Sequence, residues 1–212
     1  MAAQTPSTSP FPGVPPAERW ADRLRLWPRR TEVRRLRELL ELGPATRLLD
    51  VGGGTGAFTA RYASGLADVS VIEPREERVA LARRDRPHLR FIVGHAESLP
   101  YEDLSFDRVV AVRSVHHMAR AERFIAEAAR VLVPGGSLVV EEMAPGSLTA
   151  RLLAAPFGGH HGGGVRLRDP QEMRALLVGA GFERVETRMQ GRYYFIRGRR
   201  PTAQSDLGES ER

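Results

Sequence analysis

One short stretch of the chain combines an acidic side chain with four glycines, and this combination could bind a nucleotide-like ligand. Residues 48–56 read Leu-Leu-Asp-Val-Gly-Gly-Gly-Thr-Gly, so an apolar run ends in Asp50 and enters a turn with few side chains. Glycine permits a positive φ and lets a ligand approach bare backbone. Free amides at the start of a helix favour an anionic or hydrogen-bond-accepting group. The stretch therefore predicts a buried strand, a ligand-binding loop and a helix.

A second acidic residue, Glu73, follows the apolar run Val69–Ile72. At the carboxyl end of a strand beside the glycine loop, its carboxylate would accept hydrogen bonds from both hydroxyls of a ribose. The alternative is an acid placed near the next helix because the helix dipole favours it. The spacing Gly52-x-Gly54-x-x-Ala57, with an acid about 20 residues on, also fits the dinucleotide fingerprint, so these residues leave the nucleotide open.

The elements that must position these residues follow from the hydrophobic periodicity, because strand-like and helix-like runs alternate along the chain. The expected strands are 47–51, 69–72, 89–93, 107–112, 137–141, 182–187 and 192–198. The expected helices are 17–27, 31–42 (capped by Thr31), 56–64, 75–84, 121–132 and 170–180. This order predicts an α/β fold with a doubly wound, mainly parallel, seven-stranded sheet. A hairpin at Gln190-Gly191 would make the last strand antiparallel.

Length and composition indicate one soluble domain. The 212 residues are 42% hydrophobic and 27% charged, and no apolar run approaches the roughly 18–20 residues of a membrane-spanning helix. The domain is expected at 17–200, with residues 17–44 forming cap helices before the first strand. Residues 1–16 and 201–212 are polar and are expected to be disordered. The N-terminus lacks an apolar signal-peptide core, so we expect a cytoplasmic protein.

The charged residues and the cysteine content narrow the class further. There is no cysteine, which excludes disulfides, thiolate zinc sites and a cysteine nucleophile. The net charge is +6 and all basic residues are Arg. A net positive charge can indicate a nucleic-acid partner. A composition rich in Arg, Ala, Gly and Pro is also typical of a GC-rich genome, whose codons raise the Arg content. Because codon usage explains the positive charge, nucleic acid is disfavoured as the partner.

Motifs beyond Glu73 add a resemblance to a known family. They are Gly-His-Ala-Glu-Ser-Leu-Pro at 94–100, Phe-Asp-Arg-Val at 106–109, His116-His117, and Arg-Val-Leu-Val-Pro-Gly-Gly at 130–136. With the glycine loop, and in this order, they make the chain from about Leu48 to Glu186 resemble class I S-adenosylmethionine-dependent methyltransferases. The resemblance is strongest to the small-molecule group that includes the quinone-biosynthesis C-methyltransferases. Nicotinamide dehydrogenases do not resemble this series.

The resemblance implies S-adenosylmethionine as cofactor and gives each matching residue a role. The loop glycines and Asp50 would line the methionine part, and Glu73 would hold the ribose. The implied cofactor-binding residues are Asp50, Gly52, Gly53, Gly54, Gly56, Glu73, Pro74, His95, Ala96, Glu97 and Arg113. His95 and Ala96 would flank the adenine. The family usually has Asp where His95 stands, and a neutral His accepts through only one ring nitrogen, so this contact departs from the family's pattern. Arg113 would lie beside the sulfonium, mostly through its backbone.

On the acceptor side, the resemblance implies a small molecule covered by a lid at residues 144–168. The candidate substrate contacts are Phe157, His160 and His161, and the apolar residues before them favour a hydrophobic or aromatic acceptor. An exposed loop with incidental histidines is the alternative for the Gly158–Gly164 stretch.

Catalytic candidates are few. His116 or His117 could act as a general base, or could pack beneath the site; a metal site is not expected. In-line displacement from a sulfonium needs mostly alignment, so a strong base is optional.

Two rival classes stay open: an RNA or protein methyltransferase, and a non-catalytic protein that keeps the fold. Base N-methyltransferases carry an Asn-Pro-Pro-Tyr-like motif where this chain has Arg-Ser-Val-His at 113–116.

Overall fold

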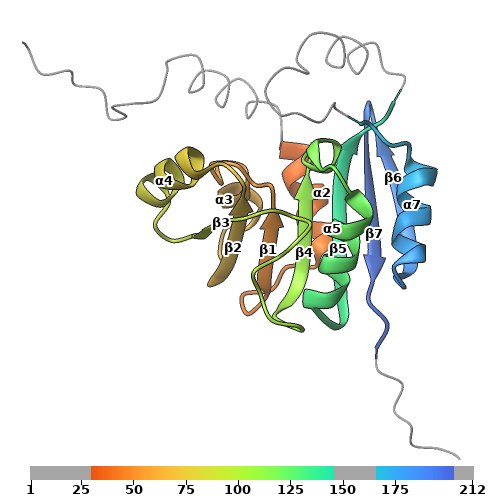
Figure 1. Cartoon of the computed structure of the whole chain (residues 1–212), viewed down its shortest axis with the longest axis horizontal. Coiled ribbons are helices and arrows are strands. Elements are labelled where there is room, and N and C mark those ends of the chain that lie inside the picture. Colours follow the sequence, from red (N-terminus) through yellow and green to blue (C-terminus); the bar gives the residue numbers. More distant parts are fainter. Residues whose placement is uncertain (1–29, 146–165, 203–212) are drawn as a thin grey trace, which may run out of the picture.

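A seven-stranded mixed sheet organises the part of the chain that the computed structural model describes, residues 30–145 and 166–202 (Figure 1). The strand order is β3-β2-β1-β4-β5-β7-β6. The strands are β1 (Arg47–Val51), β2 (Asp68–Glu73), β3 (Arg90–Val93), β4 (Phe106–Val112), β5 (Leu132–Met143), β6 (Glu183–Gln190) and β7 (Tyr193–Arg199). Neighbours from β3 to β5 pair in parallel, whereas β7 is antiparallel to both β5 and β6. The α/β fold with an antiparallel last strand is therefore confirmed.

Helices cover both faces of the sheet. They are α2 (Arg30–Leu40), α3 (Thr59–Tyr62), α4 (Glu76–Asp85), the short 3-10 helix η1 (Val115–His117), α5 (Ala121–Val131) and α7 (Pro170–Gly179). Successive residues of a strand point to opposite faces, so Leu48 belongs to a buried cluster that includes residues of α2, α3 and α4, and Leu49 to one that includes residues of α5 and α7. In Figure 1, α4 lies at the β3 end of the sheet and α7 at the β6 end.

Three expectations about these elements need correction. The helix expected at 56–64 shrinks to α3, because Gly56 has a φ of 70° and the loop before Thr59 is not helical. Thr31 lies inside α2, which starts at Arg30, and so is not its N-cap. The strand expected at 137–141 extends over all of β5.

Several expected segments lie outside the described residues. They are the first cap helix, 17–27, the two terminal segments apart from 201–202, and the lid between residues 146 and 165, with Phe157, His160 and His161. The domain boundaries and the lid stay predictions.

Candidate functional site

The glycine loop connects β1 to α3 at the carboxyl edge of the parallel strands. Gly52 and Gly56 have φ values of 77° and 70°, which L-residues rarely adopt. A Cβ on Gly52 would stand 2.5 Å from Cβ of Ser114, and one on Gly56 would stand 2.6 Å from the Phe91 ring. The loop therefore lies directly against the chain that follows β4 and against β3, which only glycine allows at both positions.

Asp50 lies beneath this loop as a buried carboxylate, with 2% of its surface exposed. Its Oδ2 accepts hydrogen bonds from the hydroxyls of Thr59, at 2.5 Å, and Tyr62, at 2.6 Å. Burial raises the pKa of Asp50 to about 6, and the nearby Glu73 charge adds to the rise, although the two hydroxyls oppose it. Its buried Oδ1 has no hydrogen-bond partner among the described residues.

Glu73 ends β2 beside the loop, and only 4% of its surface is exposed. The two strands are in register up to Val51 and Ile72, and the Gly52 N–H donates to the Ile72 carbonyl at 2.8 Å. Oε1 of Glu73 accepts from Nε of Arg75 at 3.0 Å. Within the described chain no hydrogen bond to its Oε2 is found, so one carboxylate oxygen is open to a ligand.

These groups fit the cofactor that the sequence implies. A buried carboxylate with one bare oxygen, Glu73, can accept from ribose hydroxyls, and the unpartnered Oδ1 of Asp50 can accept from an ammonium group. Above Gly54, which has a φ of 61°, an added Cβ would meet only Nη1 of Arg78, at 3.6 Å. The backbone there is open to a ligand.

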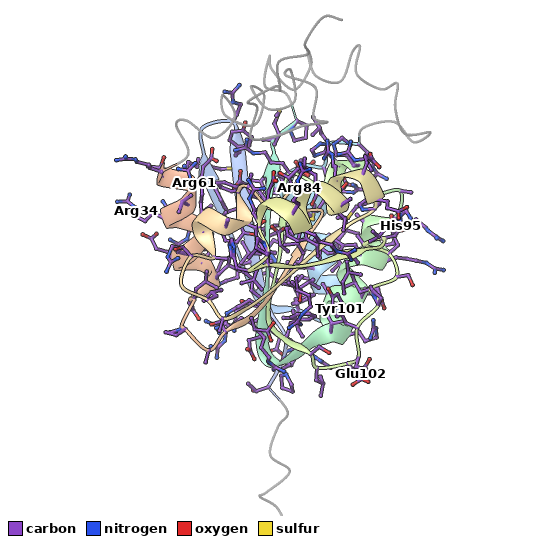
Figure 2. All side chains as sticks on the ribbon, turned by 90° about the vertical axis from the view of Figure 1, so that its left-hand side faces the viewer. Arg34, Arg61, Arg84, His95, Tyr101 and Glu102 are labelled. Atoms are coloured by element: carbon purple, nitrogen blue, oxygen red, sulfur yellow. The ribbon has the colours of Figure 1, made fainter. Side chains whose placement is uncertain are left out.

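The other implied cofactor residues lie along the same edge. After β3, His95 is exposed at the periphery of the molecule (Figure 2), whereas Ala96 is buried. Oε1 of Glu97 accepts from the Arg120 N–H at 3.4 Å, so its side chain turns toward the start of α5. Pro74 is exposed beyond Glu73. The structure thus brings the implied residues of β1, β2 and β3 to one edge of the sheet.

Arg113 follows β4 with a φ of 50°. Its N–H donates to the Glu141 carbonyl at 2.8 Å, and its Nε donates to Oε1 of the same residue at 2.8 Å. Its Nη2 lies 2.8 Å from Oε1 of Glu32 on α2, and its guanidinium stacks 3.8 Å from the Tyr193 ring centroid. The side chain therefore joins α2, β5 and β7, and the expected cofactor contact through the Arg113 backbone stays a prediction.

Sequence reasoning missed Glu142, which is 1% exposed at the end of β5. Its Oε1 lies 2.8 Å from Nδ1 of His116 on η1, and its Oε2 accepts from the His116 N–H at 3.0 Å. His117 is exposed, with its ring centroid 4.0 Å from that of His116. The sequence feature that could have identified Glu142 is the pair of acids Glu141-Glu142, which stands in a strand expected to be buried.

Among the described residues, no three His, Cys, Asp or Glu side chains gather as a metal ion would require. Over residues 30–145 and 166–202, the helices are too short or too polar to cross a membrane.

Comparisons with known proteins define the class. The family described as "Methyltransferase domain" matches residues 49–140. The ubiquinone/menaquinone biosynthesis C-methyltransferase UbiE of Ectopseudomonas mendocina is 30% identical over 190 residues, which cover 76% of this chain and 72% of that protein. The chain belongs to the class I S-adenosylmethionine-dependent methyltransferases.

Two further matches extend this result. A demethylmenaquinone methyltransferase of Renibacterium salmoninarum is 37% identical over 47% of this chain and 42% of that protein. A solved Thermotoga maritima structure, titled a S-adenosylmethionine-dependent methyltransferase and possible histamine N-methyltransferase, is 27% identical with a TM-score of 0.64. The match covers 86% of this chain and 97% of that chain. The chain spans less than half the length of three of the curated relatives that it matches.

Proposed function

We propose that this chain transfers a methyl group from S-adenosylmethionine to a small-molecule acceptor. The observation that carries the proposal is the meeting of two buried carboxylates, Asp50 and Glu73, with an open glycine loop at the carboxyl edge of β1 and β2. Ligands of open α/β sheets bind at this edge. Membership of the methyltransferase class supports the same conclusion.

When bound, S-adenosylmethionine supplies a methyl group that is already activated on a sulfonium sulfur. The protein's task is then to hold, orient and dehydrate the reactants. Glu73 would hold the ribose hydroxyls, and Oδ1 of Asp50 would accept a hydrogen bond from the ammonium group of the amino-acid part. The Ser114 hydroxyl donates to the Val51 carbonyl at 2.8 Å, which joins the turn after β4 to the end of β1.

For the acceptor, we propose a small hydrophobic or aromatic molecule, bound under residues 144–168. Two relatives are named as quinone-biosynthesis and demethylmenaquinone methyltransferases, which supports an aromatic acceptor. The name of the Thermotoga maritima structure refers to an amine instead, so acceptors vary around this fold.

Ligand binding tests the cofactor first. A compound that binds only the native state raises the melting temperature, so S-adenosylmethionine and S-adenosylhomocysteine should each stabilise the protein and NAD should not. Stabilisation by NAD alone would overturn the proposal.

Incubation of a cell extract with methyl-labelled S-adenosylmethionine then tests transfer. We expect the label in a small, organic-extractable product. Label in RNA or protein would favour the rival class of methyltransferase, and binding with no labelled product in any fraction would favour a non-catalytic role.

A further inference from the structure

His116 and Glu142 form a carboxylate–imidazole pair at the carboxyl edge of the sheet. The residues come from different elements, η1 and β5, and their side chains meet at 2.8 Å. Glu142 is 1% exposed, whereas the His116 side chain is 16% exposed and so reaches solvent or a ligand. The buried partner is thus the acid, and the accessible partner is the base.

The hydrogen bonds around Glu142 determine where His116 carries its proton. Oε1 accepts from the Met143 N–H at 3.0 Å, and Oε2 accepts from the His116 N–H at 3.0 Å. Both oxygens therefore act as acceptors, as in an ionised carboxylate. The ring nitrogen that faces Oε1 must then be the donor, which assigns the proton to Nδ1 and leaves a lone pair on Nε2. No hydrogen bond to Nε2 is found among the described residues.

The turn that carries His116 is fixed to the cofactor loop. Ser114, two residues earlier, bonds to Val51 and lies against Gly52, where an added Cβ would stand only 2.5 Å away. On its other side, the His116 carbonyl accepts from the Arg166 N–H at 3.1 Å. The ring is therefore held by Glu142, on a turn packed against the loop where the cofactor is expected.

We propose that His116 is the general base of the reaction and that Glu142 is the residue that positions it. The acceptor then belongs to the class that must lose a proton from the methylated atom: a phenol, a protonated amine or a carbon acid. This inference rests on the proposed function.

Nε2 of His116 takes the proton of the acceptor's nucleophilic atom, and the electron pair of that bond forms the new bond to the methyl carbon. The sulfonium sulfur keeps the electron pair of the bond that breaks and becomes a neutral thioether. His116 then releases its proton to water. General bases of this kind contribute roughly 10²–10⁴-fold to a rate.

Nitrogen-15 NMR of the ligand-free protein tests the geometry without any turnover. We expect the ring of neutral His116 to carry its proton on Nδ1, with Nε2 unprotonated. A ring with its proton on Nε2 would overturn the proposal, because the lone pair would then face Glu142 and not an acceptor.

Variants test the chemistry by release of labelled product from methyl-labelled S-adenosylmethionine and cell extract. His116→Asn keeps an N–H donor for Glu142 but removes Nε2, so we expect a loss of at least about 100-fold. His88→Asn, at an exposed position before β3, is the matched control, and we expect it to stay within about threefold of wild type. Equal effects of the two variants, or none from His116→Asn, would contradict the assignment.

Glu142→Gln separates positioning from simple structural support. We expect a loss of about 10- to 100-fold, with S-adenosylhomocysteine affinity by calorimetry within about twofold of wild type. The midpoint of the single ionisation in the pH–rate profile should shift in Glu142→Gln, and the ionisation should disappear in His116→Asn. A pH profile unchanged in both variants would overturn the proposal.

The product distinguishes this inference from the proposed function. If the labelled acceptor is methylated on an atom with no proton to lose, such as a thioether sulfur, then methyl transfer stands and the base is wrong. If S-adenosylhomocysteine does not bind to the wild-type protein, the proposed function itself fails.

Discussion

The Tyr62 hydroxyl donates to Oδ2 of Asp50 across 2.6 Å, and the two residues are 0% and 2% exposed. The bond joins α3 to the end of β1 directly below the glycine loop. Tyr62→Phe removes this donor from a buried carboxylate, and a hydrogen bond to a charged group contributes about 1.5–3 kcal/mol. We expect the free energy of unfolding in urea to fall by about that amount.

Tyr193→Phe is the control for this loss. Tyr193 lies under the Arg113 guanidinium, and its own hydroxyl makes no hydrogen bond among the described residues. Its replacement keeps the ring, so the free energy of unfolding should change by less than about 0.5 kcal/mol. Equal losses in the two variants would mean that the Asp50 contact does not contribute specifically.

The pKa of Asp50 predicts an unusual pH dependence of stability. Burial raises this pKa from 3.8 to about 6, so the folded state binds the proton more tightly than the unfolded chain. Stability from this group is present at low pH and is lost as the pH rises from about 4 to 6, by about 3 kcal/mol.

Asp50→Asn isolates this effect, because the other carboxylates titrate in both proteins and cancel. We expect the free energy of unfolding of wild type, minus that of Asp50→Asn, to decrease across pH 4 to 6. A flat or rising difference in urea titrations would show that Asp50 is ionised in the folded state over this range.

Glu73 is expected to determine cofactor affinity. Glu73→Ala removes the carboxylate proposed to bond the ribose hydroxyls and should weaken S-adenosylhomocysteine binding by about 1.5–3 kcal/mol, measured by calorimetry. Because Oε1 also accepts from Arg75, Arg75→Ala should be tested beside it and should have a smaller effect. Glu77→Ala, at an exposed position on α4, serves as the surface control. Wild-type affinity in Glu73→Ala would remove Glu73 from the site.

Much of the fold could be predicted from the sequence because buried parallel strands are short apolar runs between glycines and charged residues. The strand expected at Val69–Ile72, for example, is β2 with one residue more at each end. The extent of α3 could not be predicted, because its start follows the positive φ of Gly56 and the close packing of Gly56 on Phe91, a residue distant in the sequence.

The site was harder to predict than the strands, because its contacts cross long sequence separations. The sequence offered His116 and His117 as candidate bases but gave no partner for either. Glu142 reaches His116 only through the pairing of β4 with β5, in which Val112 lies opposite Glu141. In the same way, the Arg113 side chain meets Glu32 because α2 packs on the sheet, and no local pattern predicts that contact.

Arg113 couples α2 to β5, because its guanidinium lies 2.8 Å from both Glu32 and Glu141. Glu141 is 0% exposed, and Arg113→Ala would remove the guanidinium that lies 2.8 Å from its Oε1. Breaking a buried ion pair by removing one partner costs about 3–5 kcal/mol, because a charge stays buried. Since the Arg113 side chain is 25% exposed, we expect the lower end of this range.

A double-mutant cycle checks the cause. Glu141→Gln in the Arg113→Ala background removes the buried charge, so the double variant should be more stable to urea than Arg113→Ala alone. Glu32→Gln should cost less than Arg113→Ala, because it leaves the contacts with Glu141 and Tyr193 in place. If the double variant is less stable than Arg113→Ala, the loss comes from packing against Tyr193 and not from the charge of Glu141.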